Sequence, residues 1–105
     1  MTYKDLRIEL HKNHYCEATL NDIAAGIASR LGCVDSYSAN SASSQIELHL
    51  NTDSPSECDF GSAVMPTLIE FINGIGLEYE GDLINMYNIL ISHVEGNKST
   101  VIIML

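Results

Sequence analysis

Alternating hydrophobic and polar residues open the chain. Within residues 3–11, Leu6, Ile8 and Leu10 fall on one side of an extended backbone, and charged residues fall on the other. A period of two is typical of a strand that buries one face. The pattern therefore predicts a first strand over residues 3–11.

A helical period follows over residues 19–31. Apolar residues recur there at i, i+3, i+4 and i+7, which predicts a helix with one buried face. Thr19 is a suitable N-cap, and Gly32 stands where a helix usually ends. These capping residues support the predicted helix and mark its two ends.

A second helix is predicted over about residues 60–73. Its apolar residues also recur at helical spacing, and Asn73-Gly74 is expected to end it. Pro66 is tolerated only near a first turn, so the regular part is expected to begin at about Met65.

The remaining apolar segments are predicted to be strands. They are residues 34–39, 45–51, 77–80, 83–94 and 100–105, although residues 83–88 fit a helix equally well. The polar residues 40–44 would close a hairpin. Residues 100–105 are a continuous apolar run, so we expect them to be buried on both faces or at a subunit contact.

The order of these elements predicts an α+β fold in a single domain of residues 1–105. We expect an antiparallel sheet with two helices on one face, built as a ferredoxin-like β-α-β-β-α-β core with a C-terminal hairpin. Folds of this class support many unrelated functions, so function has to be argued from specific residues.

Composition limits the class of protein. The chain has 105 residues, 46% of them hydrophobic, without an apolar run of the roughly 20 residues that cross a bilayer. Its three cysteines are odd in number and form no C-x-x-C pair, which favours reduced thiols. No apolar leader is visible in the first residues. Together these features predict a cytoplasmic protein.

Charge is the most informative property of the composition. The chain carries 14 acidic and 5 basic residues, a net charge of −9. Residues 13–97 contain twelve acidic residues and a single base, Arg30, which gives this segment a net charge of −11. Such a field repels nucleic acid and anionic membranes and attracts a basic protein partner. The alternative is that the charge serves solubility alone.

The acids gather in two segments. The candidate partner-binding residues are Asp53, Glu57 and Asp59 in one loop, and Glu78, Glu80 and Asp82 around the short strand and its turn. In a strand, Glu78 and Glu80 share a face about 7 Å apart, which resembles the spacing of nucleic-acid phosphates. We therefore expect a small non-catalytic binding protein, of the inhibitor or immunity type, that engages a basic protein, a class that includes nucleic-acid-binding proteins.

Two alternatives remain. If the first and third strands are neighbours, Glu9, His11, Glu47 and His49 lie on one open sheet face and could serve a small ligand- or metal-binding enzyme. The chain could instead be a structural homodimer joined through its C-terminal strand. His11, His14 and Cys16 are metal-ligand types without a standard zinc spacing, and no phosphate-binding glycine loop or nucleophile motif is present. We therefore predict no metal, cofactor or catalytic residue.

Overall fold

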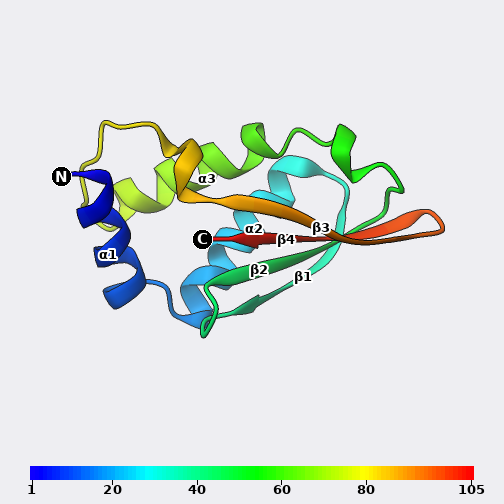
Figure 1. The fold of residues 1–105 in the computed structure, drawn as a ribbon, viewed down its shortest axis with the longest axis horizontal. Helices are drawn as coiled ribbons and strands as arrows, with labels where there is room; N and C mark the ends of the chain where they lie inside the picture. Colours follow the sequence, from blue (N-terminus) through cyan, green and yellow to red (C-terminus); the bar gives the residue numbers. More distant parts are fainter.

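The computed structural model describes all residues 1–105 and contains three helices beside one four-stranded antiparallel sheet (Figure 1). The elements are α1 (Tyr3–Asn13), α2 (Glu17–Leu31), β1 (Val34–Asn40), β2 (Gln45–Leu50), the 3₁₀ turn η1 (Pro55–Glu57), α3 (Phe60–Gly74), the 3₁₀ turn η2 (Leu83–Met86), β3 (Asn88–Glu95) and β4 (Lys98–Met104). The strand order is β1-β2-β4-β3. The predicted α+β class is confirmed. None of the helices has the length and apolar composition needed to cross a bilayer.

The first predicted strand is wrong, because residues Tyr3–Asn13 form the helix α1. Leu6 and Leu10, four residues apart, are fully buried, whereas Ile8 is 52% exposed. The Thr2 hydroxyl accepts a hydrogen bond from the backbone N–H of Asp5 at 3.1 Å and caps the helix. The ferredoxin-like order is not confirmed, since the chain begins with two helices.

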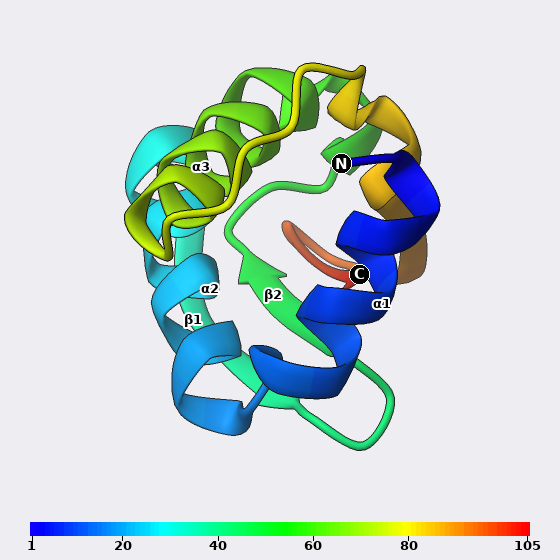
Figure 2. The same cartoon turned by 90° about the vertical axis from the view of Figure 1, so that its left-hand side faces the viewer.

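The helix α1 lies across one end of the sheet, beside the N-terminus, while α2 and α3 cover one sheet face (Figures 1 and 2). Gly26 of α2 allows this pair of helices to approach closely, because a β-carbon at residue 26 would lie 2.8 Å from Cγ2 of Thr67. Arg30 donates to the Thr67 hydroxyl at 3.1 Å and forms an ion pair with Glu70 of α3. These contacts join the two helices.

The core forms where the sheet meets these helices. Alternate residues of the two central strands are buried there, namely Ile46, Leu48 and Leu50 of β2 and Ser99, Val101 and Ile103 of β4. The intervening residues Thr100, Ile102 and Met104 are half-buried on the opposite face. The C-terminal strand is therefore not buried equally on both faces. A contact of this open face with another subunit remains a prediction.

The C-terminal end of α2 lies where the sequence predicted it, but its N-terminal end does not. Gly32 ends the helix with a φ of 74°, a left-handed conformation that favours glycine. The helix begins at Glu17, with Cys16 as N-cap, so Thr19 lies inside the first turn. The helical pattern therefore located the element and misplaced its first residue.

The helix α3 begins at Phe60, as predicted, and is helical from there and not only from Met65. Asp59 caps it by accepting a hydrogen bond from the backbone N–H of Ser62 at 3.2 Å. Pro66 lies inside the helix and cannot donate to the carbonyl of Ser62, but Ser62 is exposed, so water can solvate that carbonyl. The helix ends at Gly74, as predicted.

The segment after α3 is largely irregular. Residues 77–80 form no strand, whereas residues 83–86 form the turn η2 and the strand β3 begins at Asn88. Each of the two edge strands contains one residue without a partner in the register, Asp35 in β1 and Ser92 in β3. These are the positions of β-bulges.

Replacing Leu10 with alanine tests the corrected first element. Since Leu10 is fully buried, we expect a loss of about 2–5 kcal/mol of unfolding free energy in urea denaturation. The matched variant Ile8→Ala should change it by less than about 0.5 kcal/mol, because Ile8 is exposed. Equal losses in both variants would indicate a strand and contradict α1.

Candidate functional site

Six exposed carboxylates flank the helix α3. They are Asp53, Glu57 and Asp59 before the helix and Glu78, Glu80 and Asp82 after it, and we call them the acidic rim. The later segment leaves the C-terminal end of α3 and runs back along the helix toward η2 (Figures 1 and 2). The regular row predicted for Glu78 and Glu80 is not formed, because residues 77–80 are not a strand.

Asp59 and Asp82 converge on the phenol of Tyr87. A β-carbon at Gly61 would lie 3.7 Å from both Oδ1 of Asp59 and the hydroxyl of Tyr87. Partial burial raises the pKa of Tyr87, and the nearby carboxylates of Asp59 and Asp82 raise it further. The fold thus brings one residue from each predicted acidic segment to the same tyrosine.

Both aspartates are held by backbone groups. The carboxylate of Asp59 accepts hydrogen bonds from the backbone N–H of Ser62 at 3.2 Å and from its hydroxyl at 2.6 Å. These bonds, first of all the one from the hydroxyl, lower the pKa of Asp59. Asp82 accepts a hydrogen bond from the backbone N–H of Ile84 at 2.9 Å. Their charges therefore occupy fixed places at the starts of α3 and η2.

No basic side chain of the chain neutralises the acidic rim. Arg30 pairs with Glu70, and Lys98 pairs with Asp35 at 2.9 Å and lowers its pKa. The other three bases, Lys4, Arg7 and Lys12, belong to α1 and form no ion pair. The carboxylates of the rim therefore form no ion pair within the molecule.

The alternative cluster of Glu9, His11, Glu47 and His49 is divided between two elements. Glu9 and His11 lie on α1, where Nδ1 of His11 is 3.2 Å from the hydroxyl oxygen of Ser44. Glu47 and His49 lie on the open face of β2, with 3.3 Å between Oε2 and Nε2. The cluster depended on a first strand that does not exist.

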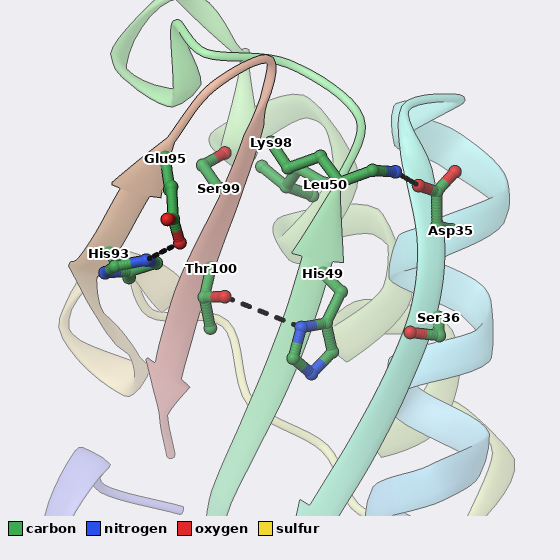
Figure 3. A pocket seen from close by; sticks show the side chains of 9 residues that line it. All are labelled: Asp35, Ser36, His49, Leu50, His93, Glu95, Lys98, Ser99 and Thr100. Carbon is green, nitrogen blue, oxygen red and sulfur yellow. Dashed lines mark hydrogen bonds and ion pairs between the residues drawn. The ribbon is translucent and has the colours of Figure 1, made fainter.

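A shallow hollow occupies one end of the open sheet face (Figure 3). The strand register places Ser36, His49, Thr100 and His93 in one row across all four strands. The hollow has a volume of about 520 Å³ and a single apolar lining residue, Leu50. Sites for small molecules are usually concave and lined mostly by apolar side chains. This hollow is shallow and its lining is mostly polar, so it does not resemble such a site.

Sequence reasoning missed the residues that packing brings together. Tyr87 and His93 carry no local signal, because their roles depend on neighbours distant in the sequence. The alternation of apolar and polar residues over residues 46–50 correctly predicted that Glu47 and His49 face outward on one strand. No three side chains of the types His, Cys, Asp and Glu lie close enough to hold a metal ion.

Comparisons with known proteins give no further assignment. No family model, no curated protein and no solved structure matches the chain.

Neutralising Asp82 tests the convergence at Tyr87. In Asp82→Asn the pKa of Tyr87 should fall toward the ordinary tyrosine value, because a carboxylate that disfavours the phenolate is removed. Alkaline absorbance titration of the chain and of its Tyr87→Phe variant isolates this one phenol. Glu17→Gln on α2 serves as the control and should leave the titration unchanged.

The cap at Asp59 should make stability depend on pH. Since its folded-state pKa is lowered, its contribution is present above the unfolded pKa and is lost as the pH falls through the folded value. Asp59→Ala should therefore lower Tm at pH 7 and lower it less at acidic pH. Asp59→Asn, which can still cap the helix but carries no charge, should lower Tm at pH 7 by less than Asp59→Ala does. Equal losses for both variants would show that charge and not capping stabilises α3.

Proposed function

We propose that the chain is a small non-catalytic binding protein that engages a basic protein partner through the acidic rim. Inhibitors and immunity proteins of nucleic-acid-binding enzymes act in this way, and we place this chain in that functional class. The proposal includes a cytoplasmic location.

The absence of ion pairs to the carboxylates of the rim supports this function above all. The two bases outside α1 are engaged by Asp35 and Glu70, which do not belong to the rim. Carboxylates without internal partners are available to cations of a second protein, and their field accelerates the encounter.

The arrangement of the rim favours a protein partner over a bound metal ion. The carboxylates are distributed along α3, whose 15 residues span about 22 Å, and no three of them lie close enough to hold a metal ion. A basic protein surface can contact such an extended set, whereas one ion cannot.

A low-salt capture from lysate of the source cells tests the proposal. The immobilised chain should retain a basic protein that elutes at a defined salt step, because screening weakens charge pairs. Asp59→Asn, Glu80→Gln and Asp82→Asn combined should reduce the retained amount at least about tenfold. Asparagine at residues 59 and 82 can preserve both caps.

The matched control removes three charges elsewhere. Asp5→Asn, Glu17→Gln and Asp22→Asn combined lower the net charge equally and should retain the partner within about twofold. Equal loss in both triple variants would mean that total charge governs capture. If no protein is retained, the role of the charge is solubility. Either result overturns the proposal.

The predicted homodimer through the C-terminal strand is kept as a separate proposal. Since β2 and β3 pair with both edges of β4, such a dimer would have to use the half-buried face of Thr100, Ile102 and Met104. Light scattering of the purified chain decides between a monomer and this dimer.

A further inference from the structure

Two thiols distant in the sequence lie side by side, one before β1 and the other in the loop that precedes α3. The sulfur atoms of Cys33 and Cys58 are 3.7 Å apart, and both residues are half-buried. Cys33 lies between α2 and β1, and Cys58 lies between η1 and α3. The third cysteine, Cys16, is exposed at the start of α2.

The backbone on either side holds this pair in place. The carbonyl of Cys33 accepts the backbone N–H of Asn51 at 2.9 Å, which joins the start of β1 to the end of β2. The N–H of Cys58 donates to the carbonyl of Pro55 at 3.1 Å, and its carbonyl accepts the N–H of Phe60 at 3.1 Å. The contact between the sulfurs is therefore built into two ordered chain segments.

We propose that Cys33 and Cys58 form a reversible disulfide, a redox modification site whose oxidant is a low-molecular-weight disulfide of the glutathione type. The sulfur atoms must approach by about 1.6 Å, from 3.7 Å to a bond length of about 2.05 Å. Side-chain rotation can supply much of this movement, because the two residues are already in contact.

The exchange balances in two steps. One protein thiolate attacks a sulfur of the small disulfide, forms a mixed disulfide and releases one small thiolate, which takes up the proton lost by the protein. The other cysteine then loses its proton and attacks the protein sulfur of the mixed disulfide, releasing the second small thiol. The protein loses two electrons and two protons, and the small disulfide gains them.

The environment of Cys58 disfavours its thiolate at neutral pH. Burial raises the pKa of its thiol, and the neighbouring Cys33 and Glu57 raise it further. The thiolate is the reactive form, so exchange at this pair should accelerate as the pH rises above neutrality.

Cys16 has the opposite character. Hydrogen bonding with Thr19, whose hydroxyl lies 3.2 Å from the sulfur, lowers the pKa of this exposed thiol. It should react first with any thiol reagent and obscure the pair. The test therefore uses Cys16→Ser, since serine is a good N-cap and preserves the start of α2.

The disulfide would close a loop around the β1–β2 hairpin and tie it to the segment that leads into Asp59. This inference stands apart from the proposed partner binding, because it requires only the two thiols and an oxidant. Restricting the unfolded chain in this way should raise Tm by roughly 10 °C.

The experiment equilibrates full-length Cys16→Ser protein in glutathione buffers of increasing disulfide content, followed by acid quenching and non-reducing peptide mapping. We expect a monomer with a Cys33–Cys58 link, a mass loss of about 2 Da, a higher Tm and full reversal by dithiothreitol. Adding Cys33→Ser or Cys58→Ser should leave a single mixed disulfide with glutathione and no gain in Tm.

The peptide map of the Cys16→Ser chain decides the matter even if the double variants fold poorly. Separate glutathione adducts on both cysteines, linked dimers, or unchanged thiols in fully oxidised glutathione at pH 8 would each overturn the inference.

Discussion

Burial of one face of the sheet against α2 and α3 is the constraint on which the rest of the structure depends. Alternate side chains of β2 and β4 enter the core, among them the fully buried Leu48, Val101 and Ile103. This alternation fixes the register, because a slip by one residue would expose all of them. It also requires that their neighbours along each strand point to the open face, where His49 and Thr100 lie.

The same constraint assigns the charged residues to particular surfaces. The helix α3 has to lie on the sheet, so the segments before and after it run over the surface and carry the acidic rim with them. Their carboxylates are exposed, and two of them stabilise element ends, Asp59 at α3 and Asp82 at η2. The proposed binding role therefore falls on two residues that also cap structural elements, and their amide variants can separate charge from capping.

Sequence patterns predicted elements wherever the period was unambiguous. The helices α2 and α3 and the strands β1 and β2 lie close to their predicted positions. The segment at residues 3–11 failed because Leu6 and Leu10 suit a helix and a strand alike, and exposed Ile8 favoured the strand. The cap formed by Thr2 and Asp5 was the available contrary signal. The convergence at Tyr87 and the contact of Cys33 with Cys58 depend on long-range packing, which no local pattern encodes.

The unpaired residues Asp35 and Ser92 have a consequence for how other chains can approach the sheet. An added strand would need a continuous ladder of main-chain donors and acceptors along β1 or β3, and each bulge interrupts that ladder. Fibril-like growth at either edge is thereby discouraged, even though Leu90, Ile91 and Val94 leave β3 partly apolar. Another protein chain can therefore bind this sheet through its side chains but not by adding a strand to either edge.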